Sequence, residues 1–251
     1  MKYLKVAGLC LVSMLVMGMA LAGNASAALL WLLCLEGSGL TKYSTNQCTT
    51  ASSTGKWQSL GIAAGVKDTV RLLAFSLRLE DTGAGTQLEC NDVGIPGTMV
   101  GVIEGPNKGK ITKFELLSPE KEGCKILKGF LTCKAGSLTN FKATNLPWNT
   151  EIFTTENKSL TRILSGGSGE PGWSLTCGGA TDSCLSESAA ASESAELINA
   201  VTNGILLVAS RFESSATSKM KCSVGGANAG KIRGLIAVLL WSGNGLSINP
   251  V

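Results

Sequence analysis

The chain has 251 residues, nine cysteines, no histidine and a formal net charge of +4. Without histidine it cannot carry a Ser-His-Asp or Cys-His catalytic centre, an imidazole metal ligand or a histidine pH switch. Because 44% of the residues are apolar and only 16% are charged, the composition is that of a folded chain rather than a disordered one. The small, interspersed charge argues against nucleic-acid binding.

Residues 1–27 are typical of a secretory signal peptide. Lys2 and Lys5 supply the positive start, residues 6–22 carry no charge, and Ala25-Ser26-Ala27 has the small side chains that a signal peptidase accepts. Cleavage after Ala27 would leave 224 of the 251 residues and reduce the net charge to +2, because Lys2 and Lys5 are removed. We therefore expect a secreted or extracellular protein, with attachment to the cell surface as an option.

Two alternatives to this cleavage remain open. Ala20-Leu21-Ala22 offers a second cleavage site, and the apolar residues 28–35 could extend the segment into an uncleaved anchor, although Gly23, Asn24 and Ser26 interrupt the run. No later apolar run reaches the ~18 residues that a membrane span needs. We expect no stable membrane insertion after cleavage. The secreted β-rich domain then spans 28–251, with 28–140 and 141–251 as two sub-halves.

The cysteines of the exported chain predict disulfide bonds. Cys10 leaves with the signal, and an even number of cysteines in an oxidising compartment indicates up to four bridges. The candidates are Cys34, Cys48, Cys90, Cys124, Cys133, Cys177, Cys184 and Cys222. Short spacing favours the pairs Cys34–Cys48, Cys124–Cys133 and Cys177–Cys184, which leaves Cys90 with Cys222, although sequence alone does not choose among the 105 pairings. Without a C-x-x-C motif or histidine, no metal site and no cofactor are expected.

Strand patterns dominate the first half of the mature chain. Residues 70–80 are rich in apolar residues and partly alternating, and two further strand-like segments at 110–117 and 125–133 are separated by Pro119 and Gly123.

The C-terminal third carries the clearest local signal. Asn203-Gly204 between 196–202 and 205–213 predicts a β-hairpin, because both residues tolerate the positive φ of a type I′ turn. A helix running from Ser186 is the alternative, since the alanines and glutamates of 189–196 favour helix. We prefer the hairpin and leave 185–195 open as a loop or short helix. The apolar segment 231–241 predicts a last, buried strand.

A weak internal repeat accompanies these strands. Arg78-Leu79-Glu80 and Cys90 are followed by the G-x-I-x-G-like segment 101–105, and Arg211-Phe212-Glu213 and Cys222 are followed by 230–234. Chance matches are common in glycine-rich β proteins, so a duplication and a coincidence both remain open. Regular strand spacing without a βαβ rhythm predicts an all-β fold: a disulfide-stabilised antiparallel sandwich or barrel, with two related halves as an option.

Candidate chemistry is sparse. Trp148 and Trp173 stand beside prolines in turn-like sequence and are the best candidates for ligand-contacting aromatics, although tryptophans that plug a β core are the more ordinary interpretation. No carboxylate is marked out as half of a glycosidase pair, and Glu170 in a glycine-rich turn is the most site-like. Ser53-Thr54-Gly55-Lys56 matches S-x-x-K without its partner motifs, and 105–110 is one residue short of a P-loop.

Three segments carry a resemblance to other proteins. Leu146-Pro147-Trp148, the segment 166–177 (GGSGEPGWSLTC) and the segment 222–234 (CSVGGANAGKIRG) resemble a group of exported bacterial proteins with signal peptides, paired cysteines and repeated β-strands. The resemblance spans most of the mature chain and its motifs are structural. It implies location and fold type, and carries no site residues.

The sequence therefore favours a secreted binding or structural surface protein without catalysis, with an extracellular glycan or protein as partner. The alternatives are an extracellular hydrolase that uses carboxylates and a secreted inhibitor or effector. Exposed aromatics on one face would favour binding, and two carboxylates in one cleft would favour hydrolysis.

Overall fold

The computed structural model describes residues 29–38, 41–90, 99–115, 124–128, 140–155, 158–177, 179–187, 194–212 and 220–249. Every regular element in these residues is a β-strand, which confirms the predicted all-β class. The described residues contain no helix with the length and apolar character that a membrane span requires. In chain order the strands are β1 (Trp31–Glu36), β2 (Trp57–Gly61), β3 (Lys67–Asp81), β4 (Thr86–Cys90), β5 (Met99–Glu104), β6 (Lys108–Phe114), β7 (Cys124–Lys128), β8 (Asn140–Thr144), β9 (Trp148–Thr155), β10 (Lys158–Leu164), β11 (Gly172–Cys177), β12 (Ala180–Ser186), β13 (Ser194–Thr202), β14 (Ile205–Phe212), β15 (Met220–Cys222), β16 (Gly226–Leu240) and β17 (Leu246–Ile248).

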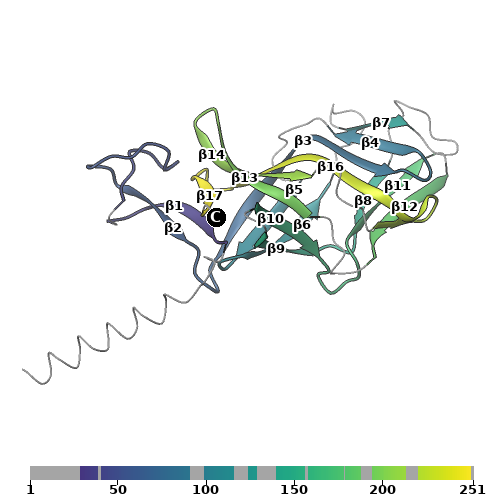
Figure 1. Ribbon diagram of the computed structural model, residues 1–251, viewed down its shortest axis with the longest axis horizontal. Coiled ribbons are helices and arrows are strands. Elements are labelled where there is room, and N and C mark those ends of the chain that lie inside the picture. The colour runs from purple at the N-terminus through teal and green to yellow at the C-terminus, as the bar shows by residue number, and fades with distance from the viewer. Residues whose placement is uncertain are drawn as a thin grey trace, which may run out of the picture.

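An eight-stranded antiparallel barrel forms the middle of the molecule (Figure 1). Its strands follow the order β3-β5-β6-β9-β10-β13-β14-β16, and β16 pairs with β3 to close the ring. Of the two predicted architectures, the chain adopts the barrel. Closure leaves no edge strand in this ring, so each barrel strand has both of its neighbours.

Two long strands extend beyond the barrel into a second sheet. β3 and β16 each have 15 residues and pair with each other along most of that length. The first part of β3 pairs with β5 and its last part with β4, while β16 pairs first with β15 and then with β14. The second sheet therefore runs β7-β4-β3-β16-β15-β12-β11-β8. It lies at the opposite end of the barrel from β1, β2 and β17 (Figure 1).

The strands change sheet at a backbone irregularity. The β3–β16 register shifts between Arg233 and Leu235, where Gly234 has a φ of 110° and Ser76 on β3 has a φ of 50°. A Cβ on Gly234 would lie 2.3 Å from the Ser76 carbonyl oxygen. Only glycine fits this crossing, because it has no Cβ and adopts positive φ freely. The irregularity separates the barrel part of each long strand from the part in the second sheet.

A three-stranded sheet, β17-β1-β2, covers the other end of the barrel. The backbone N–H of Trp31 donates to the carbonyl of Pro106 in the β5–β6 turn, 2.8 Å away. Asn199 on β13 exchanges two hydrogen bonds of 2.8 Å with the backbone of Ile248 on β17. The first and last strands described thus meet at this barrel end and are fixed to it.

The predicted strands correspond to observed ones, with two corrections. The hairpin is β13–β14, and Asn203 and Gly204 have φ values of 51° and 77°, as a type I′ turn requires. Residues 185–195, left open above, begin in β12 and end in β13, and the part 188–193 lies outside the described residues. The segment 231–241 is not the last strand, because β17 follows it, and Trp241 is 51% exposed rather than buried.

The two copies of the sequence repeat enter different pairings. In the first copy β3 pairs directly with β4, whereas in the second copy β14 and β15 both pair with β16. The two proposed sub-halves, 28–140 and 141–251, both contribute strands to the barrel and to the second sheet.

Candidate functional site

The two tryptophans singled out from the sequence lie in the core. Trp148 on β9 is 4% exposed and Trp173 on β11 is 2% exposed. The Trp148 ring packs against Phe114 at a centroid distance of 5.4 Å, and its indole N–H donates to the Thr144 carbonyl at 2.7 Å. Both residues line small cavities where the barrel meets the second sheet, so neither presents a stacking surface to solvent.

The cysteine pairing departs from the spacing argument. The Cys34–Cys48 bridge is present as predicted, and its partners are 14 positions apart in the sequence. The predicted Cys177–Cys184 pair is wrong, because Cys184 is bonded to Cys222, which lies directly opposite it on β15. The β11–β12 register places Cys177 opposite Ala180 and Cys184 opposite Trp173, so the two near neighbours do not face each other.

The predicted Cys90–Cys222 pair is wrong for the same reason, since Cys222 is already bonded to Cys184. Cys90 is in a disulfide, and Cys124 is the residue opposite it in the β4–β7 register. Cys133 lies outside the described residues, so the Cys124–Cys133 prediction stays untested. The bonded cysteines place the folded protein in an oxidising environment.

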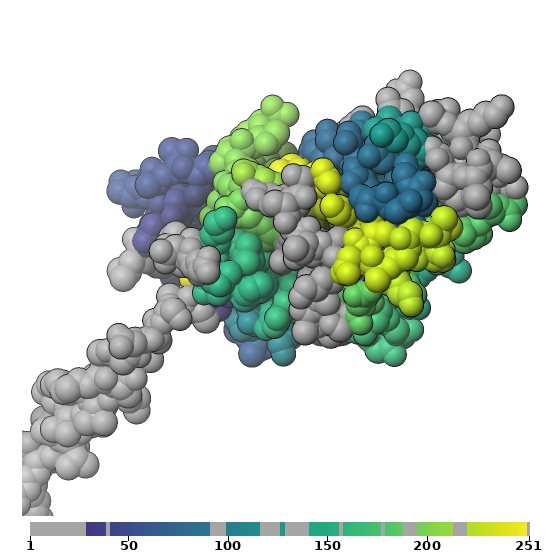
Figure 2. All heavy atoms as spheres, turned by 45° about the vertical axis from the view of Figure 1, so that its right-hand side comes forward, coloured from purple at the N-terminus to yellow at the C-terminus, as the bar shows by residue number. Residues whose placement is uncertain are grey.

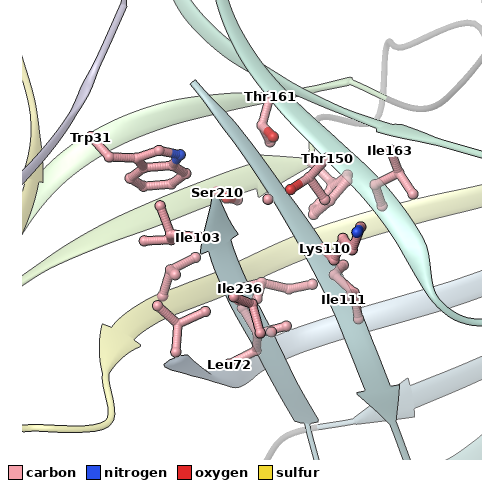
Figure 3. A pocket seen from close by; sticks show the side chains of 16 residues that line it. Trp31, Leu72, Ile103, Lys110, Ile111, Thr150, Thr161, Ile163, Ser210 and Ile236 are labelled. Atoms are coloured by element: carbon pink, nitrogen blue, oxygen red, sulfur yellow. The ribbon is translucent and has the colours of Figure 1, made fainter. Parts of the chain in front are cut away.

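A cavity of about 60 Å³ lies inside the barrel and is the candidate functional site (Figure 3). Inward-facing residues of the barrel strands and Trp31 from β1 line it. Apolar side chains make up most of the wall, namely Val70, Leu72, Ile103, Ile111, Ile163, Phe212, Ile236 and Val238. An apolar chamber with a few polar groups is the usual form of a small-molecule site.

The polar groups of this cavity gather where Trp31 enters it. Trp31 is 5% exposed, and its indole Nε1 is buried without a hydrogen-bond partner among the described residues. Figure 3 shows this nitrogen turned toward the space that Thr150 and Thr161 also border. The Thr161 hydroxyl donates to the Glu151 carbonyl at 3.3 Å, which leaves its oxygen able to accept. Ser210, only 6% exposed, also borders the cavity.

The cavity presents no free charge from its described lining. Lys110 is the one ionisable residue that borders it, and its ammonium group is 3.2 Å from the Glu104 carboxylate. Glu104 also pairs with Lys67 at 2.9 Å. The hydrogen bond from Lys67, followed by that from Lys110, holds the pKa of Glu104 below its usual range. The Lys110 side chain, 38% exposed, is therefore ion-paired with a carboxylate that it shares with Lys67.

Trp31 was not singled out from the sequence. It lies in the apolar run directly after the predicted cleavage site, where its hydrophobicity has an ordinary explanation as part of the signal region. Long-range contacts bring it to the barrel, namely that of β1 with the β5–β6 turn and that of the neighbouring β17 with β13, and no local pattern encodes them.

A second cluster contains two carboxyl groups with no exposed surface. Asp81, at the end of β3, accepts hydrogen bonds from the backbone N–H groups of Gly83, Ala84 and Gly225, at 2.9, 3.0 and 2.8 Å. Asp182 on β12 accepts one from the Ser223 hydroxyl at 3.1 Å. Both carboxyls are 0% exposed. The cluster thus joins β12 to two turns that follow β3 and precede β16.

The pKa of Asp182 is raised by its surroundings. Burial, followed by the charge of Asp81 and a hydrogen bond to it, raises the pKa of Asp182 to about 6. Figure 2 shows the segments around the two turns side by side, with β3–β4 in blue and β15–β16 in yellow.

Asp81 also lies near the sulfur atoms of Cys184 and Cys222, with the ligand atoms within 4.8 Å of one another. Those sulfurs are bonded to each other, so they offer no thiolate to a metal. Both oxygen atoms of Asp81 accept hydrogen bonds from backbone N–H groups.

The other motifs from the sequence have structural positions. Lys56 of the S-x-x-K match lies 3.1 Å from Glu36 in an exposed ion pair. The segment 105–110 forms the β5–β6 turn and the start of β6. Glu170 lies in the turn before β11, where its backbone carbonyl accepts from Asn145 at 2.7 Å. None of these positions places a second catalytic group beside the first among the described residues.

Comparison with protein-family models, with curated proteins and with solved structures found no match for this chain.

Proposed function

We propose that the protein is a secreted binding protein without catalysis, and that it holds a small, mostly apolar molecule inside its barrel. The observation that carries this proposal is the chamber itself, an apolar space of about 60 Å³ bordered by the unpartnered indole N–H of Trp31. Buried polar groups in folded proteins almost always have a partner. An exception that faces a cavity is best explained by a ligand that supplies one.

The two ends of the barrel support a binding chamber between them. Trp31 of the β17-β1-β2 sheet lines the cavity at one end, and Trp148 packs against Phe114 toward the other. A ligand inside would lose much of its contact with water, as ligands in small barrels do. The signal-like residues 1–27 and the Cys34–Cys48 and Cys184–Cys222 disulfides support export to an oxidising space outside the cell.

The hydrolase alternative receives no comparable support. Its best carboxyl pair, Asp81 with Asp182, has no exposed surface and does not line the barrel cavity. A polymer substrate could not reach these groups in this arrangement.

The test fills the cavity with larger side chains and measures the uptake of xenon, a neutral apolar atom. Ser210→Leu and Val238→Phe each add carbon atoms inside the barrel, whereas Thr112→Leu adds them on an exposed position of β6. We expect the ¹²⁹Xe NMR shift to change with protein concentration for the wild type and for Thr112→Leu. Each filling variant should lose at least half of that dependence.

Folding of each variant is checked by circular dichroism and by the mass of the oxidised chain. If both filling variants fold and take up xenon as the wild type does, the barrel is not the binding site and the proposal is wrong.

A further inference from the structure

The polar groups of the barrel cavity specify more than an apolar ligand. Nε1 of Trp31 can only donate a hydrogen bond, and it is buried with no partner in the part of the chain that the structure describes. The matching group on a ligand is an acceptor oxygen or nitrogen. Trp148 shows the contrast, since its indole N–H has the Thr144 carbonyl as its partner and needs nothing from a ligand.

The charge of the ligand can be inferred from the residues that line the cavity. Lys110, the ionisable residue among the described lining, is ion-paired with Glu104 at 3.2 Å. The Lys110 side chain is also 38% exposed, so it is not a buried counter-charge for a ligand inside the barrel. A charged ligand would lose its water without gaining such a counter-charge, which costs far more than burying a neutral group. We therefore expect an uncharged ligand.

The size follows from the volume. A water-sized group needs about 10–15 Å³ of such space, so a cavity of about 60 Å³ holds a ligand of roughly four to six non-hydrogen atoms. The remaining wall is apolar, with Ile103, Ile163 and Val238 among the residues that would contact the body of the ligand.

Resting on the proposed function, we infer that the barrel takes a small neutral carbonyl-type molecule, whose oxygen accepts a hydrogen bond from Trp31 Nε1–H while its hydrocarbon part fills the chamber. The unpartnered donor, the neutral wall and the limited volume each point to this class. A small ketone or ester meets all three conditions.

Two probes of nearly equal shape test the inference. Cyclopentanone carries a carbonyl oxygen, and methylenecyclopentane carries a CH₂ group in its place. The five tryptophans give five indole N–H signals in a ¹⁵N NMR spectrum, and the signal lost in Trp31→Phe identifies Trp31. We expect cyclopentanone to move the Trp31 signal downfield and methylenecyclopentane to leave it near its original position.

The affinities provide the second measurement. One neutral hydrogen bond contributes about two- to tenfold in affinity, so cyclopentanone should bind the wild type more tightly than methylenecyclopentane by that factor. Trp31→Phe keeps an aromatic plug and removes the donor, so it should abolish the preference. The Trp173 indole N–H, which is also buried and unpartnered but lies outside the barrel cavity, serves as the internal reference and should not shift.

The outcomes separate the two proposals. If both probes bind with equal affinity and the Trp31 signal does not move, the inference about the carbonyl is wrong while binding in the barrel stands. If neither probe binds and xenon uptake is unaffected by Ser210→Leu and Val238→Phe, the proposed function fails as well. A downfield shift of Trp173 instead of Trp31 would move the site to the other cavity and overturn the inference.

Discussion

At the scale of single residues, burial away from water changes the electrostatics of two carboxyl groups, Asp81 and Asp182. Asp81 and Asp182 lie far apart in sequence, and the bond from Gly225 to Asp81 alone spans 144 residues. No local pattern in the sequence marks either carboxyl, because each becomes unusual only through its distant neighbour. The pair illustrates why the sequence could not predict this cluster.

The raised pKa of Asp182 makes stability depend on pH. The pKa of Asp182 is raised from 3.8 to about 6, so the folded protein holds a proton that the unfolded chain releases. The stabilisation is complete below pH 4 and is lost as the pH rises through 6. A shift of this size corresponds to about 2–3 kcal/mol. We therefore expect the contribution of this pair to the free energy of unfolding to fall between pH 4 and pH 7.

Asp182→Asn should remove that dependence. The amide is always neutral, its NH₂ group can donate to Asp81, and its oxygen can accept from Ser223. We expect the variant to be more stable than the wild type at pH 7.5 by up to about 2 kcal/mol, and similar to it at pH 4. Urea unfolding at pH 4, 5, 6 and 7.5 measures both.

Asp81→Asn is the control for this prediction. Its amide cannot accept all three backbone N–H bonds, so it should be destabilised at every pH. Equal losses for the two variants at pH 7.5 would contradict the raised pKa of Asp182 as the source of the pH dependence.

At the level of the strands, sequence patterns correctly predicted the features that depend on residues close together in the sequence. The Asn203-Gly204 turn and the two flanking strands are present as predicted, because a type I′ turn depends on residues that touch in sequence. The pairing of Cys184 with Cys222 was missed, because it depends on β12 lying beside β15, 38 residues further along the chain. Trp31 was missed as a site residue for the same reason, since β1 reaches the barrel through a distant turn.

The crossing of β3 and β16 gives a prediction about backbone geometry. Gly234→Ala places a Cβ 2.3 Å from the Ser76 oxygen at a φ of 110°, so the two strands must separate. We expect a loss of about 3 kcal/mol or more in the free energy of unfolding, measured by urea titration.

Gly204→Ala is the matched control for that substitution. Gly204 also has a positive φ, 77°, but its Cβ would meet nothing within 4 Å. Its cost should be limited to the backbone preference, about 1–2 kcal/mol. If the two variants lose equal stability, the contact at the crossing is not what requires glycine.

At the scale of the whole molecule, the Cys34–Cys48 bridge holds the β17-β1-β2 sheet, here called the cap, on the barrel. Gln47, beside Cys48, donates to the Gly243 carbonyl at 2.7 Å and accepts from the Leu206 N–H at 2.8 Å. The bridged loop therefore contacts both the start of β14 and the segment before β17. Closing a loop of this length contributes about 3 kcal/mol in the entropic account.

Replacing both Cys34 and Cys48 by serine should loosen this end first. We expect amide hydrogen exchange, measured by mass spectrometry, to accelerate most in β1 and β2, with a smaller change in β10 on the barrel wall. The Cys184/Cys222 double-serine variant is the comparison, and its largest change should lie in β12 and β15. Acceleration of β10 equal to that of β1 would contradict a separate role for the cap.

The sequence predicted a β protein with disulfides and left sandwich and barrel open. The choice between them depends on the pairing of β3 with β16, and the bond between Thr82 and Ala229 in that region joins residues 147 apart. Alternation within a strand shows which face is buried, and it does not show which distant strand lies beside it.

That pairing also sets an order of assembly. β3 leaves the ribosome or the export channel long before β16, yet both the barrel ring and the second sheet need β16 as the neighbour of β3. Until residues 226–240 arrive, β3 has an open edge along most of its length, and such edges invite pairing with other chains. The protein must therefore complete two sheets in one late event, and the chain is most prone to aggregation just before residues 226–240 emerge.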